Sequence, residues 1–389
     1  MNSEAYLERV RELLPGLRER ARECEELRRI PDTTVKEFDE AGLLRAVQPA
    51  RWDGYELSPL ALFQGAALVA SACPSSAWFL SVVGVHNWQL ALFPDAAQEE
   101  VWGQDTGVRI SSSYAPTGKV EVLDEGFRLS GRWSFSSGCD HCDWVFLGGV
   151  VRREGKPSEM RTFLLPRSDY AIDDTWFVSG LSGTGSKDIL VEGAFVPEHR
   201  THSLVDAYNL DSPGQANNPG PSYRLPFGCV FAFGISAPAI GAAEGAFDAY
   251  RSYMREKRLT GGVLKLSEDP FAQRRLSQAA GEIGASRSEL ESTLATLCAL
   301  AEAREPIPLE LRTRARFNSA NIVQRCVRAV DTLFEASGGR AIFLDSPMQR
   351  FFRDVHAMRA HAANNPERAA QIFGFSELNP GEPPIDLFL

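Results

Sequence analysis

The sequence has few cysteines and no regular spacing between them. Seven cysteines are spread over 389 residues. Secreted domains held by disulfides carry even sets of cysteines at fixed intervals, so this odd, scattered set predicts a protein of the reducing cytoplasm. The first residues alternate acids and bases where a secretory signal would have an apolar core. A membrane span needs roughly 20 predominantly apolar residues, and no apolar run in the sequence approaches that length. We therefore expect no membrane partner.

Positive charge is also scarce. The chain has 41 Lys and Arg residues against 51 Asp and Glu residues, a formal net charge of -10. Nucleic-acid surfaces need clustered Lys and Arg to neutralise phosphates. This composition therefore argues against a nucleic-acid partner.

The apolar pattern divides the chain into an α+β protein of three parts. Helical spacing of apolar residues predicts an N-terminal helical domain over 1–105. Alternating residues, with a hairpin signal at 124–126, predict a central antiparallel β-barrel or sandwich over 106–203. Four long helical patterns from 228 onward predict a C-terminal four-helix bundle and tail over 228–389.

The segment 204–227 has no such periodicity. Its middle, 211–221, is rich in Pro, Gly, Ser and Asn and is predicted to lack regular structure. Long loops in compact proteins are functional or disordered. We interpret this one as a flap near the functional site rather than a plain linker.

A strand that breaks into a Ser-Ser-Gly turn is the clearest candidate site. Residues 131–135 alternate large and small side chains, and Ser136, Ser137 and Gly138 follow. Hydroxyls, free N–H groups and nearby tryptophans at a strand end suit a flat polar ring such as a flavin. The adjoining Cys139 and Cys142 form half of a zinc motif, but no second pair follows at zinc-ribbon spacing, so we interpret them as part of a packed turn.

The glycine-rich run 180–187 resembles a phosphate loop but ends in Gly-Ser-Lys and precedes a strand. No G-x-G-x-x-G motif opens a strand–helix unit either, so a Rossmann dinucleotide site is not supported. The hydroxyls and N–H groups of this turn are better suited to contact a cofactor.

The histidines offer candidates for proton chemistry. His199 and His202 lie in a polar loop and are predicted to be solvated. His86 lies in a predicted apolar helix. It can be either a core histidine or a residue of the functional site. His356 and His361 are predicted to share the last long helix, where five residues separate them by about 140°, so only one can line a given pocket. His361 precedes small polar residues and is our candidate to accept a proton.

Several stretches together resemble the acyl-CoA dehydrogenase fold. They are 72–78, 84–86, 91–94, 111–118, 133–140, 180–187, 338–339 and 353–357. Within that superfamily the chain is most similar to the oxygenase components of two-component flavin monooxygenases, such as the hydroxylases of 4-hydroxyphenylacetate and of a phenolic seco-steroid. True dehydrogenases commonly carry a catalytic glutamate after the last arginine–aspartate pair. Here 362–366 contains no carboxylate, which favours oxygenation.

The resemblance implies a division of labour between proteins. A separate NAD(P)H:flavin reductase supplies reduced FMN or FAD, O2 adds to form a C4a-hydroperoxyflavin, and one oxygen atom passes to an aromatic phenol. It also implies a homotetramer. The fused-ring or single-ring identity of the substrate stays open.

The resemblance also assigns residues. Ser137, with Ser136 as the alternate, matches the hydrogen-bond partner of flavin N5, His361 matches the histidine that assists phenol deprotonation, and His86 and Ser112 match the positions that hold the substrate hydroxyl. Aromatic Trp78 and Trp88 are expected to shape the substrate pocket. The expected flavin contacts are Tyr114, Ala115, Pro116, Thr117, Trp133, Phe135, Ser136, Ser137, Gly138, Arg258, Gln273, Gly338 and Gly339.

Two other functions remain open from the sequence. One is a flavin dehydrogenase or oxidase of the same fold, acting on a thioester or a related carbon acid. The other is a non-catalytic flavin-binding protein. No metal site is expected.

Overall fold

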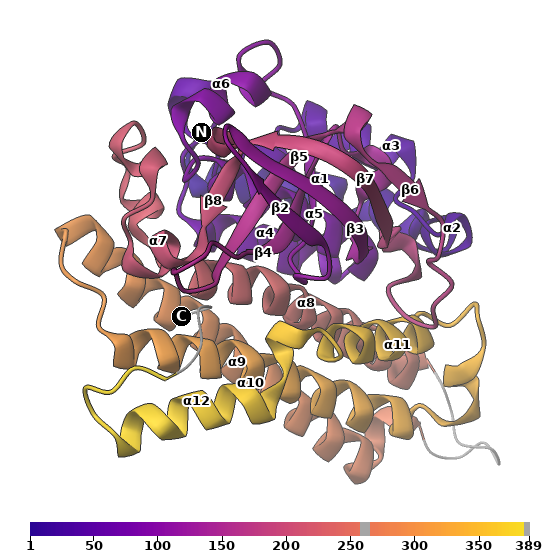
Figure 1. Cartoon of the computed structure of the whole chain (residues 1–389). Helices are drawn as coiled ribbons and strands as arrows, with labels where there is room; N and C mark the ends of the chain where they lie inside the picture. Colours follow the sequence, from indigo (N-terminus) through magenta and orange to yellow (C-terminus); the bar gives the residue numbers. More distant parts are fainter. Residues whose placement is uncertain (257–264, 385–389) are drawn as a thin grey trace.

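The computed structural model describes residues 1–256 and 265–384. Its elements follow the predicted order of helices, strands and helices, and Figure 1 shows the long C-terminal helices lying together below the strands and the N-terminal helices. The N-terminal helices are α1 (Ser3–Glu19), α2 (Ala21–Leu27), α3 (Asp32–Glu40), α4 (Pro59–Ala70), α5 (Pro74–Leu90) and α6 (Asp95–Trp102).

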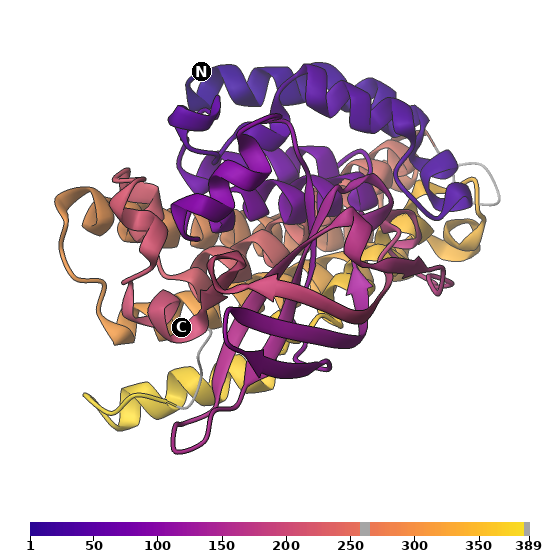
Figure 2. The same ribbon diagram turned by 45° about the horizontal axis from the view of Figure 1, so that its top comes forward.

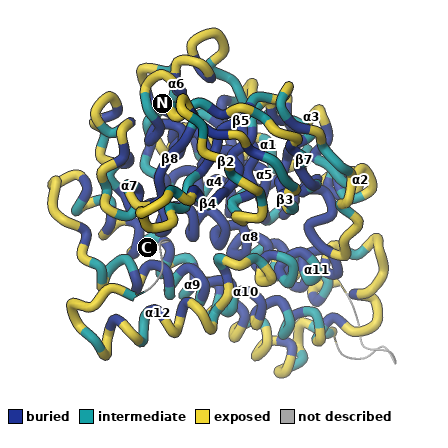
Figure 3. The backbone as a smooth tube through the Cα atoms, viewed as in Figure 1, coloured by how far each residue is buried: buried dark blue, intermediate teal, exposed yellow. Residues whose placement is uncertain are grey.

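Helix α5 is the central element of this part. All 17 of its residues are buried, and the central blue tube in Figure 3 includes it. A helix that is apolar all round can only be stable when it is covered on every side. Here α4, α8, strand β1 and the turn 182–184 all contact it. The burial explains why this helix has no polar face in the sequence.

The central part contains two four-stranded sheets. One has the order β1–β4–β5–β8 and the other β2–β3–β7–β6. The strands are β1 (Ile110–Ser113), β2 (Lys119–Leu123), β3 (Gly126–Ser136), β4 (Trp144–Val151), β5 (Glu159–Pro166), β6 (Ala171–Asp173), β7 (Lys187–Pro197) and β8 (Thr201–Ser203). The predicted hairpin is present between β2 and β3. Pairing is antiparallel except between β1 and β4, which are parallel. Between the sheets a separate apolar core forms around Trp133, Phe127 and Phe163. Figure 2 shows the sheets against one side of the helices.

The C-terminal part is made of α8 (Phe227–Glu256), α9 (Pro270–Ala303), α10 (Leu309–Ala336), α11 (Pro347–Arg359) and α12 (Pro366–Leu378). Small residues let α8 approach α4 closely, since a Cβ placed on Gly241 would lie 1.7 Å from the carbonyl oxygen of Ala67. Helix α8 is long and apolar enough to pass a membrane-span test by composition. Its apolar window is 94% buried inside the protein, as in a core helix.

The fourth predicted helix of this part is two helices. α11 ends at Arg359 and α12 begins at Pro366, with a short 3-10 turn between them. The prediction that His356 and His361 share one helix was therefore wrong. Pro366 explains the break, because proline favours the first turn of a new helix and disfavours helical geometry in the residue before it.

The segment 204–227 is more regular than its composition predicted. It contains α7 (Leu204–Asn209) and two 3-10 turns, Pro213–Ala216 and Pro221–Arg224. Its polar groups bind the N-terminal helices: Asn218 Nδ2 donates to Ala91 O at 2.8 Å, and Trp88 Nε1 donates to Ser222 O at 2.8 Å. Side-chain hydrogen bonds to distant backbone replace periodic structure here, and composition does not reveal them.

Asn218→Ala tests this anchoring. The buried amide also contacts Gln98 Oε1 and Gly214 O, so the substitution leaves acceptors without a donor and should lower the free energy of unfolding by about 1–3 kcal/mol. Chemical denaturation measures the change. Asn217→Ala, at the exposed neighbouring position, is the matched control. Equal stability of both variants would show that the Asn218 bonds do not hold the segment.

Candidate functional site

The Ser-Ser-Gly turn follows a strained strand end. Register shifts in β3 between Trp133 and Ser136, and Phe135 within this bulge has a φ of 69°. A bulky residue at positive φ is costly and usually marks a functional constraint. The bulge leaves the Phe135 ring 70% exposed while the neighbouring Ser136 is fully buried. Next in the chain, Gly138 has a φ of 73°, and a Cβ there would lie 2.5 Å from the Phe79 ring.

The two serines of the turn have different partners. Ser136 Oγ donates to Ser111 Oγ at 3.1 Å, inside the β domain. Ser137 Oγ accepts from Trp78 Nε1 at 3.0 Å and lies 2.8 Å from Ser186 Oγ. The predicted residues Trp78 and Ser137 are thus in direct contact. Ser186 belongs to the glycine-rich turn that the sequence singled out.

That turn packs directly against the serines. Gly138 N–H donates to Thr184 O at 2.9 Å, and Thr184 Oγ1 lies 2.7 Å from Ser186 Oγ. Leu181 N–H donates to the buried carboxyl of Asp354 on α11 at 2.6 Å. Strand end, glycine-rich turn and C-terminal helix therefore form one hydrogen-bonded unit.

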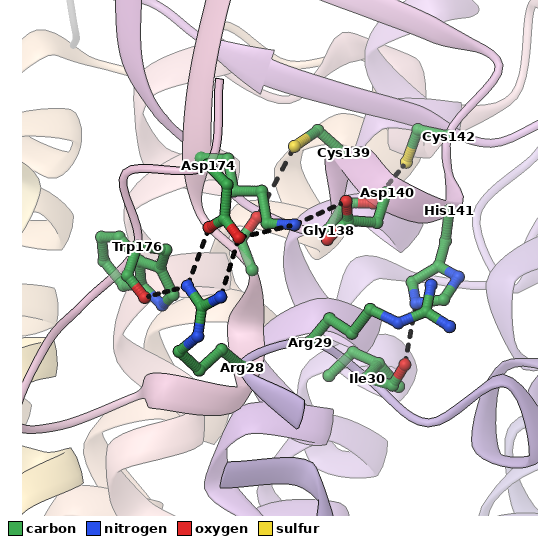
Figure 4. Close-up of polar contacts among 12 residues, drawn as sticks. Arg28, Arg29, Ile30, Gly138, Cys139, Asp140, His141, Cys142, Asp174 and Trp176 are labelled. Carbon is green, nitrogen blue, oxygen red and sulfur yellow. Dashed lines mark hydrogen bonds and ion pairs between the residues drawn. The ribbon is translucent and has the colours of Figure 1, made fainter. Parts of the chain in front are cut away.

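The cysteine-containing turn is held by backbone bonds (Figure 4). The thiols of Cys139 and Cys142 donate to the carbonyls of Gly185 and Gly138, at 3.6 and 3.3 Å. His141 Nε2 is 2.8 Å from Ile30 O. Burial raises the pKa of the Cys139 thiol to about 12, so it is protonated and a poor metal ligand.

Lys187 bridges this turn to the loop before β7. Its ammonium lies 2.9 Å from Asp140 and 3.8 Å from Asp174. Arg28 binds Asp174 through two 2.8 Å bonds (Figure 4). These ion pairs fix the position of the turn relative to α2.

His86 is a buried histidine with one nitrogen left unpaired. It is 0% exposed, and its Nδ1 lies 2.6 Å from Ile110 O. A carbonyl can only accept, so Nδ1 carries the proton and Nε2 is an acceptor. Among the described residues Nε2 has no hydrogen-bond partner. Burial lowers the pKa of His86 to about 4, so the ring is neutral at pH 7.

His361 has the opposite arrangement. The N–H of Ala363 donates to its Nδ1 at 3.1 Å, so the proton of the neutral ring is on Nε2. Its side chain is partly exposed by surface area, yet the surrounding packing lowers the pKa to about 4, with the charge of the buried Arg316 adding to the effect. His361 therefore offers a donor at pH 7 and His86 an acceptor.

A series of ring contacts joins the two histidines. His361 lies 5.8 Å from the ring of Trp78 and 6.5 Å from that of Phe231; Phe231 lies 5.0 Å from Tyr114, which lies 6.2 Å from His86. The sequence interpretation missed Phe231 and its stacked neighbour Phe227. Both lie in the first turns of α8, where apolar residues are most simply interpreted as core. Only their ring contacts in the folded protein show that they belong to the series between the two histidines.

The remaining predicted substrate residues lie around this series. Ser112 is buried in β1 and interacts with Tyr114, whose pKa burial raises. The Tyr114 hydroxyl donates to Gln89. Trp88 stacks on Phe227 at 6.2 Å and holds the 204–227 segment through Ser222.

The other predicted flavin contacts are spread more widely. Trp133 is buried between the sheets, donating to Gly148 O at 2.8 Å. Ala115, Pro116 and Thr117 are exposed after β1. Gln273 is exposed in the first turn of α9, and its amide donates to Ser267 O at 3.0 Å. Gly338 and Gly339 are exposed after α10. Arg258 lies outside the described residues.

His202 differs from its prediction. It is 2% exposed, its Nε2 lies 3.0 Å from Ser212 Oγ, and burial lowers its pKa to about 3. His199 is half-buried and pairs with Glu100 at 3.0 Å. The polar surroundings of His202 in the sequence conceal that β8 pairs with β5 at the sheet edge and carries it inward.

The residues at the turn fit a flavin. An exposed ring at Phe135 and the buried hydroxyls of Ser136 and Ser137 supply the apolar and polar partners that such a ring needs. A separate hollow of about 530 Å³ lies at the β8–α7 edge, lined by Arg161, Glu198, His199 and Asp206 among others. None of the predicted site residues that the structure describes lines this hollow.

Comparison with known proteins gives the family. Residues 2–106 match the acyl-CoA dehydrogenase N-terminal domain and residues 233–366 the acyl-CoA dehydrogenase C-terminal domain. The chain therefore belongs to the acyl-CoA dehydrogenase family.

Individual relatives place it more narrowly. The chain is 46% identical over 372 residues to the flavin-dependent monooxygenase oxygenase subunit HsaA of Rhodococcus jostii, covering 95% of this chain and 97% of the relative. It is 33% identical over 374 residues to the oxygenase component of p-hydroxyphenylacetate 3-hydroxylase of Acinetobacter baumannii, covering 95% and 88%. The crystal structure of 3-HSA hydroxylase from Rhodococcus sp. RHA1 superposes with a TM-score of 0.95 at 46% identity, covering 99% and 98%. Within the family, the chain is an oxygenase subunit of the flavin-dependent monooxygenases.

The buried His86 predicts a pH dependence of stability. The unfolded chain protonates this ring near pH 6.5 and the folded protein only near pH 4. The unfolded state thus binds the extra proton as pH falls, and stability drops. Between pH 7 and pH 5 the contribution is about 2 kcal/mol.

Denaturation of the parent and of His86→Gln at both pH values measures this contribution. The variant should lose less stability on acidification than the parent. Asn217→Ala, at an exposed position that carries no titratable group, should keep the parent's pH slope. An unchanged pH slope in His86→Gln would show that His86 is not held neutral.

Proposed function

We propose that the chain hydroxylates a phenol, using O2 and reduced FMN or FAD supplied by a separate NAD(P)H:flavin reductase. The observation that carries this is the histidine pair: one buried imidazole offers an acceptor, the other a donor, and a series of aromatic rings joins them. The phenol O–H needs the acceptor, and the negative charge that develops during oxygen transfer needs the donor. The relative from Acinetobacter baumannii is named for a phenol, p-hydroxyphenylacetate, which agrees with this substrate class.

The histidines then have distinct roles. His86 Nε2 accepts the phenol O–H, with Ser112 near the same oxygen. His361, beside Trp78 and so near Ser137, would donate its Nε2–H to negative charge that develops at that end of the site during oxygen transfer. This arrangement reassigns the deprotonation expected of His361, because its Nδ1 already accepts from Ala363. With a pKa near 4, His86 is a weak base, so it polarises the phenol rather than removing its proton beforehand.

Bound reduced flavin would supply the electrons that activate O2. Ser137 would hold the flavin N5, and Phe135 and the Ser136–Gly138 backbone would bound its ring. Packing around Trp78 and Phe231 excludes water from the reacting atoms, which limits loss of the oxygen as hydrogen peroxide.

Other flavin contacts fit a homotetramer. Gly338 and Gly339 are exposed and are followed by three exposed apolar residues, Ile342 (66%), Phe343 (55%) and Leu344 (74%). Such a patch favours contact with a second copy. Through this contact Gly338, Gly339 and Gln273 would reach a neighbouring subunit's flavin. A cytoplasmic location supplies the reductase and its nicotinamide.

The function is tested by mixing the protein with reduced FMN or FAD without oxygen, then adding oxygenated buffer and a simple phenol. We expect a catechol, with less hydrogen peroxide than flavin oxidised. The methyl ether of the phenol, which lacks the O–H that His86 accepts, should give little product.

A parallel reaction separates the alternatives. Bleaching of oxidised flavin on the protein by an acyl-CoA, without phenol hydroxylation, would contradict the proposal and indicate a dehydrogenase. Neither reaction, with flavin still bound, would indicate a non-catalytic binder.

His361→Ala should slow hydroxylation on the order of 100-fold, the usual cost of losing one donor at a developing negative charge. The flavin should still be oxidised, so hydrogen peroxide rises as product falls. The matched control is His356→Ala, on α11 and paired with Asp331 at 2.8 Å. Equal product yields in the two variants would remove His361 from the reaction.

A further inference from the structure

The hydrogen-bond directions around Ser137 follow from one fixed point. Thr184 Oγ1 lies 2.9 Å from the carbonyl oxygen of Leu181. A carbonyl has no proton to give, so the Thr184 hydroxyl donates to this oxygen, which also accepts from Thr184 N–H and Trp176 Nε1, both at 3.1 Å. Its only proton is then committed.

The next two hydroxyls must follow the same direction. Ser186 Oγ lies 2.7 Å from Thr184 Oγ1 and 2.8 Å from Ser137 Oγ. Because Thr184 has no second proton, it accepts from Ser186. Ser186 has then used its own proton and accepts from Ser137. The protons therefore point from Ser137 through Ser186 and Thr184 to Leu181.

Trp78 completes the assignment. Its indole N–H can only donate, and it lies 3.0 Å from Ser137 Oγ. Ser137 therefore gives its one proton to Ser186 and accepts one from Trp78. A hydroxyl oxygen has two lone pairs, so one acceptor position remains and no donor.

The remaining acceptor position on Ser137 Oγ distinguishes the two redox states of a flavin. Reduced flavin carries a proton on N5 and can donate to an acceptor. Oxidised flavin has a lone pair on N5, which an acceptor repels. We propose that Thr184 and Ser186 are positioning residues that orient the Ser137 hydroxyl as an acceptor, so that the site favours reduced over oxidised flavin. The inference depends on the proposed function, in which Ser137 meets N5.

The hydroxyl relay, by which we mean Ser137, Ser186 and Thr184, is built into the fold. Thr184, Ser186 and Ser137 are 1%, 4% and 6% exposed, so bulk water does not offer alternative partners for their protons. The bond from Gly138 N–H to Thr184 O holds the turn against Ser137, and Asp354 holds Leu181 from α11. These contacts fix the direction of the protons before flavin arrives.

Thr184→Val allows the hydrogen bonds between the hydroxyls to reverse their direction, and Ser186→Ala breaks them. Without the Thr184 hydroxyl, Ser186 can turn its proton to Ser137; without Ser186, the Ser137 proton has no partner. In both variants Ser137 becomes free to donate toward N5. Dissociation constants of oxidised and dithionite-reduced FMN and FAD are measured without oxygen, for parent and variants.

We expect the preference for reduced flavin to shrink about tenfold in both variants, the factor that one hydrogen bond contributes. Thr184→Ser keeps the hydroxyl and should keep the parent's ratio of dissociation constants for oxidised and reduced flavin. If Thr184 acted only through packing, loss of its methyl group would change this ratio as well. Thermal denaturation checks the fold of each variant, and Ser186→Ala carries the test alone if Thr184→Val does not fold.

Ser137→Ala separates the two ideas. Loss of preference in Ser137→Ala, with parental ratios in both relay variants, would overturn the relay and leave the Ser137 contact standing. Unchanged affinities for both redox states in Ser137→Ala would overturn the N5 contact of the proposed function together with the relay.

Discussion

The complete burial of α5 is the constraint on which the site depends. With all 17 residues covered, this helix has no surface position at which it can shift or rotate without losing packing. It carries Trp78 to the serines of the β domain and His86 to the carbonyl of Ile110. Apolar burial on every side thus fixes two polar contacts that lie about 12 Å apart along the helix.

Buried polar groups are usually paired, so an unpaired acceptor beside the aromatic rings is a candidate partner for a ligand. His86 Nε2 is one such acceptor. The remaining lone pair of Ser137 is another, deduced from its neighbours' protons. Both are acceptors, and each has a natural donor in the proposed reaction: the phenol hydroxyl for His86 and the reduced flavin N5 for Ser137.

The turn between α11 and α12 decides what His361 can do. The turn 362–366 contains no carboxylate. Instead, its backbone pairs with His361 at Nδ1 and so leaves Nε2–H as a donor. In the proposed function, this donor stabilises the negative charge that develops during oxygen transfer.

The sequence by itself determined the order of helices and strands, the Ser-Ser-Gly turn and the candidate histidines, because periodicity and turn residues act locally. The tertiary structure alone decided how these features work. It divided the last helix before His361, buried His202, brought Phe231 and Phe227 beside the histidines, and joined Thr184 and Ser186 to Ser137. These outcomes depend on contacts between distant segments, and hydrogen-bond direction depends on which groups meet there, so no local pattern could have shown them.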